Sequence, residues 1–311
     1  MILELAPMEG LTTYIFRRAY AHYYHAIDRY YTPFLSLHQE KEWGKKELME
    51  LAEENNPGQP LIPQVLTNSA AAFQKAEESF LDMGFTEVNI NLGCPSRTVT
   101  AKKKGSGMLR EPEELNRFLE EIFTRTKIDI SIKTRLGVHD ASEWEALLAV
   151  YNQYPITELI IHARVSDDFY GNTTNVEAFR YAMENSKNPL CYNGDIFSKE
   201  DYRVLMEQCG CEVPVMLGRG ILYRPVLGGE IKEDEKTDYV RLKAFHDEIY
   251  EGYRKIQSGD RNLLFRMKEL WTYLAESTKD PKGYRKKIHK TNRCSELDSV
   301  LSQIWSELLI G

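Results

Sequence analysis

The chain has 311 residues, 42% of them hydrophobic, which is enough to bury a large core and to build one large domain beside a smaller one. A net charge of −7 argues against a surface that binds nucleic acid throughout, and five scattered cysteines without a CxxC pair argue against a disulfide framework. The N-terminus has no basic leader, and no stretch approaches the roughly 20 apolar residues of a membrane span. We therefore predict a cytoplasmic protein with free thiols and no membrane segment.

Short apolar strands alternate with helical segments through the first 229 residues. The strands are predicted at residues 3–6, 29–32, 61–66, 87–91, 129–133, 158–162, 190–192 and 214–217. Helices are predicted between them at residues 69–83, 112–126, 141–153, 176–184 and 198–208. Eight such units favour a closed (β/α)8 TIM barrel over an open sheet, so the fold class is α/β. A polar insert, 33–60, includes a predicted helix around 45–54 and lies where an active-site lid could sit.

The barrel pattern stops near residue 229, and an acidic linker is predicted at 230–240. Three helical runs follow, at 239–257, 261–276 and 295–309, so residues 241–311 are expected to form a small all-helical domain. This domain carries 14 Lys and Arg against 10 Asp and Glu, a balance of +4, whereas residues 1–240 carry −11. The segment 282–293 has six Lys and Arg and no acid. Such asymmetry is typical of a polyanion partner, although a solvated basic helix would look the same.

Polar side chains or glycine turns follow every predicted strand except the second, and in a barrel these strand ends share one face. The turns Asn193-Gly194-Asp195 and Gly218-Arg219 follow the last two strands, where backbone N–H groups can approach a phosphate. Lys133, on an inward strand position, requires an anionic partner. A flavin ring would supply one, and a carboxylate partner is the alternative.

Cys94 lies between Gly93 and Pro95, directly after a strand. A thiol of ordinary pKa is about 97% protonated at pH 7, so it can donate a proton to a substrate. For a cysteine outside such a Gly-Cys-Pro turn, an inert buried thiol is more common than a reactive one. His22 and His25 have helical spacing but no third ligand in view, so no metal site is predicted.

These motifs together resemble the flavin-dependent tRNA-dihydrouridine synthases, most of all the bacterial subgroup called DusC. The matching segments are Ala6-Pro7-Met8-Glu9-Gly10, Gln64, Asn89-Ile90-Asn91-Leu92-Gly93-Cys94-Pro95, Gly105-Ser106-Gly107-Met108-Leu109, Lys133-Thr134-Arg135-Leu136-Gly137, His162-Ala163-Arg164, Tyr170-Gly171, Asn193-Gly194-Asp195-Ile196, Gly218-Arg219-Gly220 and Phe265-Arg266-Met267-Lys268-Glu269-Leu270-Trp271. They occur in the order typical of the family.

The resemblance implies FMN in the barrel mouth, NADPH or NADH as reductant, and hydride transfer to C6 of a uridine whose C5 is protonated by Cys94. Implied cofactor contacts are Pro7, Met8, Glu9, Gln64, Lys133, His162, Asn193, Gly194, Asp195, Gly218 and Arg219. Implied substrate contacts are Asn91, Arg135, Arg164, Tyr170, Lys102, Lys103, Arg266, Lys268, Arg285, Lys286 and Lys287. The helical domain would hold a tRNA from which the target base is extruded. No protein partner is implied, and a monomer is expected.

Three alternatives to this interpretation stay open. The same chemistry could act on ribosomal RNA in place of tRNA. An FMN barrel acting on a small pyrimidine would share the phosphate turns and Lys133, but would have no use for a basic helical domain. A non-catalytic RNA-binding protein with this fold would need neither Cys94 nor Lys133.

Overall fold

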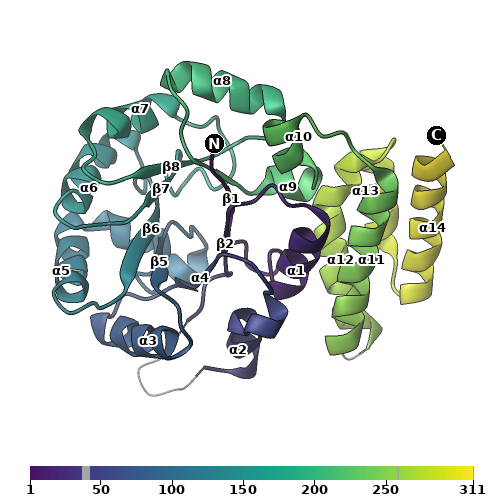
Figure 1. Ribbon diagram of the computed structural model, residues 1–311, viewed down its shortest axis with the longest axis horizontal. Helices are drawn as coiled ribbons and strands as arrows, with labels where there is room; N and C mark the ends of the chain where they lie inside the picture. Colours follow the sequence, from purple (N-terminus) through teal and green to yellow (C-terminus); the bar gives the residue numbers. More distant parts are fainter. Residues whose placement is uncertain (37–42, 258, 311) are drawn as a thin grey trace.

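A closed barrel of parallel strands forms the larger part of the protein (Figure 1). The computed structural model describes residues 1–36, 43–257 and 259–310. The strands are β1 (Leu3–Leu5), β2 (Arg29–Tyr31), β3 (Leu61–Ile62), β4 (Gln64–Val65), β5 (Glu87–Leu92), β6 (Asp129–Arg135), β7 (Leu159–His162), β8 (Leu190–Asn193) and β9 (Val215–Leu217).

The sheet order runs from β3 through β2, β1, β9, β8, β7, β6 and β5 to β4. Its two ends, β3 and β4, are consecutive in the chain and separated by Pro63 alone. The predicted third strand is therefore divided at Pro63, which has no N–H to donate to a ladder. Its first half pairs with β2 and its second half with β5, so the sheet closes on itself. The predicted TIM barrel is confirmed.

Alternation along each strand separates the barrel interior from the face that the helices cover. On β7, Leu159 and Ile161 pack in the core shared with the helices, whereas Ile160 packs inside the barrel. The residues of that inner cluster are Ala6, Tyr31, Ile62, Ile160, Cys191 and Met216. On β5, Ile90 and Leu92 belong to the helix-facing core, so period-two alternation turns Asn91 inward near the carboxyl end. The same alternation on β6 turns Lys133 inward.

The barrel helices are α1 (Tyr14–Tyr23), α2 (Lys45–Leu51), α3 (Ala70–Asp82), α4 (Arg97–Thr100), α5 (Pro112–Phe123), α6 (Trp144–Tyr151), α7 (Val176–Asn185), α8 (Lys199–Cys209), α9 (Arg219–Tyr223) and α10 (Leu227–Glu233). Short 3-10 helices lie at Glu53–Asn55, Gly105–Arg110, Ala141–Glu143 and Ala275–Ser277. The starts of α3, α7 and α8 are fixed by the side chains of Ser69, Asn175 and Ser198, each of which accepts a hydrogen bond from a backbone N–H of the first turn. Among the described residues, the helices are too short or too polar to cross a bilayer.

The C-terminal region has four helices in its described residues, one more than predicted: α11 (Tyr239–Ile256), α12 (Asp260–Leu274), α13 (Pro281–Lys290) and α14 (Cys294–Ile310). The added helix, α13, lies in the basic segment. Pro281 occupies its first turn and Asp280 caps it by accepting from the N–H of Gly283. About half of the predicted linker 230–240 is helical, because α10 continues to Glu233 and α11 begins at Tyr239, which leaves residues 234–238 between them.

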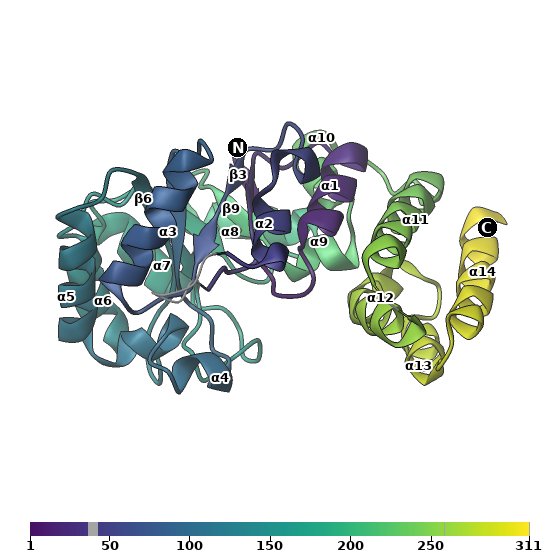
Figure 2. The same cartoon turned by 90° about the horizontal axis from the view of Figure 1, so that it is seen from below.

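The helical region packs beside α1 and α9 of the barrel (Figures 1 and 2). Phe245 of α11 meets Phe16 and Tyr24 of the barrel edge-on, with ring centroids 5.5 and 5.4 Å apart. The hydroxyls of Tyr253 and Thr13 are 2.9 Å apart across the same contact. A buried aromatic interface of this kind fixes the helical region against the barrel.

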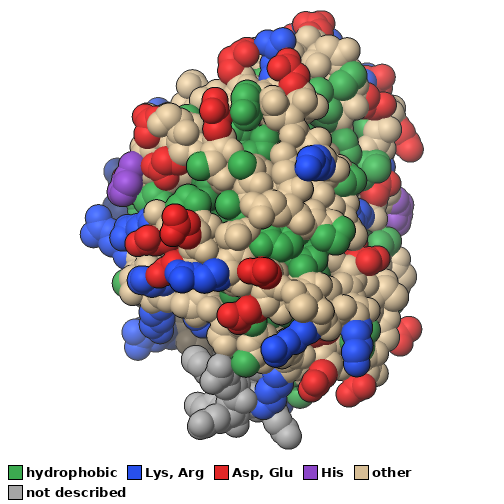
Figure 3. All heavy atoms as spheres, turned by 90° about the vertical axis from the view of Figure 1, so that its left-hand side faces the viewer, with side chains coloured by type: hydrophobic (Ala, Val, Ile, Leu, Met, Phe, Trp, Pro, Cys, Tyr) green, Lys and Arg blue, Asp and Glu red, His purple; other side chains and the backbone are tan. Residues whose placement is uncertain are grey.

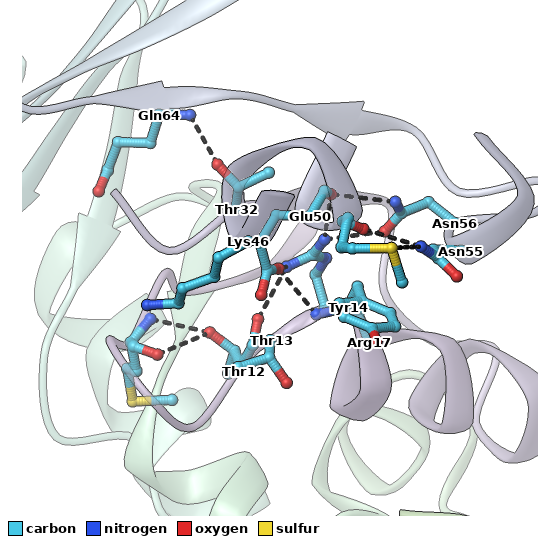
Figure 4. Close-up of polar contacts among 12 residues, drawn as sticks. Thr12, Thr13, Tyr14, Arg17, Thr32, Lys46, Glu50, Asn55, Asn56 and Gln64 are labelled. Atoms are coloured by element: carbon cyan, nitrogen blue, oxygen red, sulfur yellow. Dashed lines mark hydrogen bonds and ion pairs between the residues drawn. The ribbon is translucent and has the colours of Figure 1, made fainter. Parts of the chain in front are cut away.

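The insert 33–60 is tied to the barrel by a buried ion pair (Figure 4), and its residues 37–42 lie outside the described part. Arg17 of α1 donates to Glu50 of α2 at 2.9 Å, and both side chains are buried. Arg17 also donates to Asn56 Oδ1 at 2.8 Å, and Glu50 accepts from the N–H of Tyr14 at 2.8 Å. The described part of the insert is therefore a fixed wall rather than a free lid.

Candidate active site

Two adjoining cavities open at the carboxyl ends of the strands and share six lining residues, and together they are called the pocket below. One has a volume of about 500 Å³ and the other about 930 Å³. The residues that line both are Pro7, Met8, Lys133, His162, Tyr170 and Arg219. Side chains from separate strand ends thus converge at the face where barrel enzymes carry out their chemistry.

Lys133 lies at the floor of this pocket. Its Nζ donates to Asn193 Oδ1 at 2.7 Å. Burial, followed by the nearby charge of Arg135, lowers the pKa of Lys133 to about 7. Burial and the surrounding cations also hold the pKa of His162 well below its usual value, so its imidazole is neutral at pH 7. In the empty pocket both shifts favour the neutral forms, whereas a bound anion would favour the charged forms.

A buried amide holds the turn that carries Cys94. Asn91 Oδ1 accepts from the backbone N–H of Gly93 at 3.1 Å and of Cys94 at 2.9 Å. On the other side, Ser106 donates to the Cys94 carbonyl through its N–H at 3.1 Å and its hydroxyl at 3.0 Å. Burial raises the pKa of the Cys94 thiol, so the thiol stays protonated at pH 7. Cys94 lines the larger cavity and can act there as a proton donor.

Gln64 is fully buried and lies behind the pocket wall. Its Nε2 donates to Asn89 and its Oε1 accepts from Asn91, each at 2.8 Å. In this arrangement Gln64 orients Asn91, and through it the Cys94 turn. It is not among the residues that line either cavity.

Arg135 and Arg164, which were predicted to bind substrate, donate most of their hydrogen bonds to other groups of the protein. Arg135 donates to the carbonyls of Gly93, Val165 and Phe169 at 2.9, 2.8 and 2.7 Å, and it still lines the larger cavity. Arg164 is buried outside the lining.

Arg164 donates to the carbonyls of Gly171 and Asn172 at 2.8 and 2.7 Å and pairs with Asp195. Arg135 and Arg164 therefore fix the two loops that surround the pocket mouth.

The glycine turns after β8 and β9 line the smaller cavity. Their residues, all among the predicted cofactor contacts, are Asn193, Gly194, Asp195, Gly218 and Arg219. Arg219 Nη2 lies 2.5 Å from Asp195 Oδ1, so this carboxylate is shared between Arg164 and Arg219. The guanidinium of Arg219 also lies 4.9 Å from the ring centroid of Tyr170, whose side chain is 55% exposed at the mouth.

The helical region adds two residues to the larger cavity that were not predicted, Glu269 and Tyr273 of α12. Glu9, Asn91 and Phe34 line the same cavity from the barrel side. The contribution of α12 could not be predicted without knowing how the helical region docks.

The basic residues predicted to bind substrate lie outside the pocket and differ in their freedom. Lys103 lies 3.4 Å from Glu114, while Lys102 is exposed beside it on the loop after α4. Arg266 donates to the Gly10 carbonyl at 3.2 Å, and Lys268 to that of His289 at 3.1 Å.

On α13, Arg285 pairs with Glu276 and Lys287 Nζ lies 3.3 Å from Gln303 Oε1. Lys286 is exposed between Lys282 and Lys290, which share its face at four-residue spacing; we call Lys282, Lys286 and Lys290 the lysine stripe. Within the described residues, no ion pair involves these three. By contrast, the barrel face in Figure 3 intersperses basic with acidic side chains.

The fold and the site define an enzyme of the TIM-barrel class whose pocket brings together Cys94, Lys133 and Arg219 at the strand ends. The chain belongs to the dihydrouridine synthase family, whose model matches residues 4–306.

Similar proteins agree with this assignment. Two are named tRNA-dihydrouridine(16) synthase, from Neisseria meningitidis serogroup A (27% identical, 89% of this chain, 86% of the other) and serogroup B (25%, 98% and 95%). A probable tRNA-dihydrouridine synthase of Staphylococcus aureus is 28% identical over 81% of this chain and 78% of its own. Among solved structures, an old yellow enzyme homologue from Zymomonas mobilis shares the fold, with a TM-score of 0.53 and 12% identity over 76% of this chain and 89% of the other.

Proposed function

We propose that this protein reduces the C5=C6 bond of a uridine in tRNA, with FMN as bound cofactor and NADPH or NADH as reductant. The observation that supports this most directly is the convergence of the Cys94 thiol and the Lys133 amine on one pocket of a chain that belongs to the dihydrouridine synthase family. An acid and an electropositive floor are what reduction of an activated C=C bond requires.

The pocket residues fit a flavin mononucleotide. Lys133 is a half-buried amine whose pKa is lowered to about 7, and a nearby anion would stabilise its ammonium form. At Gly218 an added Cβ would lie 3.5 Å from Ala6 Cβ and 3.7 Å from Met8 Sδ, so the glycine leaves room beside these residues. Pro7, Met8, Lys133 and His162 would hold the ring, and the turns at 193–195 and 218–219 the phosphate. When bound, FMN supplies the hydride.

The residues of the chain supply the proton and the orientation. Cys94 transfers its thiol proton to C5 of the uracil ring, on a backbone position fixed by Asn91 and Ser106. Arg135 fixes the Cys94 turn relative to the loop at 165–169 by donating hydrogen bonds to carbonyls of both segments. Tyr170, exposed at the mouth, offers an aromatic face to the base.

A tRNA substrate accounts for the basic features outside the pocket. A uridine within folded tRNA must leave its stack to reach Cys94. The lysine stripe and Lys102 carry exposed ammonium groups that can contact phosphates while the base enters. Position 16 is the first nucleotide to examine, because two relatives are named for it.

The test is to purify the protein, record its visible spectrum, incubate it with NADPH and unmodified tRNA, and map dihydrouridine by nucleotide. We expect a yellow protein that modifies one uridine, and a Cys94→Ala variant that keeps its colour and its reduction by NADPH but loses about 100-fold or more in dihydrouridine formation. A yellow protein that leaves every tRNA unchanged would redirect the proposal to ribosomal RNA or a small pyrimidine. A colourless protein would favour an RNA-binding role, and full activity of Cys94→Ala would remove Cys94 as the acid.

A further inference from the structure

Helix α12 reaches from the helical region into the pocket with two polar side chains one turn apart. Glu269 and Tyr273 have i, i+4 spacing, so they emerge on one face of the helix. The opposite face, including Met267 and Trp271, is buried in the core. Both polar residues line the cavity that also contains Cys94. The helical region thus contributes to the chemistry of the pocket as well as to the outer surface.

The carboxylate of Glu269 is held in place yet keeps one oxygen free. Its Oε2 lies 3.4 Å from Arg266 Nη1, and Arg266 donates in turn to the Gly10 carbonyl at 3.2 Å. An added Cβ at Gly10 would lie 3.1 and 3.2 Å from the two carboxylate oxygens, so the group rests directly against that backbone. Within the described residues, Oε1 has no hydrogen-bond donor. It is an unused, positioned acceptor.

The hydroxyl of Tyr273 complements this acceptor. Its ring packs against Tyr223 with centroids 5.5 Å apart, which orients the side chain. Burial raises the pKa of Tyr273, so the phenol stays protonated and can donate. No hydrogen bond to this hydroxyl is found in the described part of the chain. Glu269 and Tyr273 therefore present an acceptor and a donor side by side to whatever enters the cavity.

We propose that Glu269 and Tyr273 bind the nucleotide delivered to Cys94, Glu269 accepting a hydrogen bond from it and Tyr273 donating one to an adjacent oxygen. This inference rests on the proposed function and names two residues that would select its substrate. A uridine offers a donor beside an oxygen at two places: the uracil imide, where N3–H lies between two carbonyls, and the ribose 2′-hydroxyl. At the imide, cytosine would place a lone pair against the carboxylate, so the same contact would reject it.

The experiment is a cycle between protein variants and tRNA variants. Once wild-type holoenzyme has been shown to form dihydrouridine at a mapped position, which establishes the proposed function separately, three tRNAs are made with uridine, 3-methyluridine or 2′-deoxyuridine at that position. Dissociation constants are measured without NADPH for wild type and for Glu269→Ala and Tyr273→Phe. Glu251→Ala removes an exposed carboxylate of α11 and controls for the change in charge.

With ordinary tRNA we expect Glu269→Ala to weaken binding by about 10- to 100-fold, Glu269→Gln to recover part of this loss, and Glu251→Ala to have little effect. Removing the matching group from the RNA should then weaken binding to wild type but scarcely affect Glu269→Ala. If the effect of 3-methyluridine disappears in Glu269→Ala, the contact is with the imide. If the effect of 2′-deoxyuridine disappears, the contact is with the ribose. The proposal would be overturned if each modified RNA lost the same factor of affinity for Glu269→Ala as for wild type, even if Glu269→Ala itself binds tRNA poorly.

Discussion

Gly105 tests how strictly the backbone around Cys94 is specified. Its φ is +56°, and an added Cβ would lie 2.7 Å from the Cys94 carbonyl oxygen, 3.1 Å from Cys94 Cβ and 3.0 Å from Val99 Cγ1. The substitution Gly105→Ala therefore combines an unfavourable left-handed conformation with a collision against the turn that carries the acid. The conformation costs about 1–2 kcal/mol. Displacing the carbonyl also loses a hydrogen bond from Ser106, about 1 kcal/mol more.

Gly84→Ala is the matched control. Its φ is +87°, but an added Cβ would meet nothing within 4 Å. Gly84→Ala should lose about 1–2 kcal/mol of unfolding free energy in urea, and Gly105→Ala about 2–3 kcal/mol. Only Gly105→Ala should also lose dihydrouridine formation, by about 100-fold if the thiol moves by about 1 Å. Equal stability loss together with full activity of Gly105→Ala would refute the view that this glycine positions Cys94.

Three further predictions follow from charges in the structure. The pKa of Lys133 is about 7 in the ligand-free protein against 10.5 for a free lysine, so the unfolded chain binds more protons between those values. Lys133→Met should accordingly raise the thermal midpoint of the ligand-free protein most at pH 7 and below, and the gain should vanish toward pH 10.5; a constant gain would contradict the assignment. Arg17→Met leaves Glu50 buried without its cation and should cost about 3–5 kcal/mol in urea unfolding, with part regained on adding Glu50→Leu. Glutamine at all three positions of the lysine stripe should lower the salt dependence of tRNA binding by about two to three in log–log slope, whereas Arg180→Gln on α7 should leave it unchanged.

The barrel could be predicted because its strands carry their own periodicity. Alternation turned Asn91 and Lys133 inward, and glycine and proline marked the turns at the carboxyl ends. The division of one strand at Pro63 follows from the missing N–H, a property that the sequence contains. Helix α13 escaped prediction because its basic residues mask the periodicity, although Asp280 and Pro281 mark its start.

The partners of the site residues could not be predicted in the same way. Arg164 and Gln64 stand in motifs expected to contact ligands, but Arg164 donates to carbonyls of the loop that follows it, and Gln64 bonds to amide side chains of β5. A motif identifies a guanidinium or an amide; the fold decides which acceptors surround it. For the same reason Glu269 and Tyr273 were missed, since their place in the pocket depends on the docking of α12.

Under the proposed function, that docking would link RNA binding to the chemistry of the pocket. The aromatic contacts of Phe245 with Phe16 and Tyr24 fix α11 against the barrel, and Arg266 fixes α12 against Gly10. A helical region held at both places cannot turn independently of the loop that carries Met8. Under the proposed function, the distance between phosphates bound at the lysine stripe and the thiol of Cys94 would be set by the fold rather than by the RNA. The proposal then predicts that a uridine is modified if the folded tRNA places it at that distance, so that this interface, together with Glu269 and Tyr273, selects the nucleotide position.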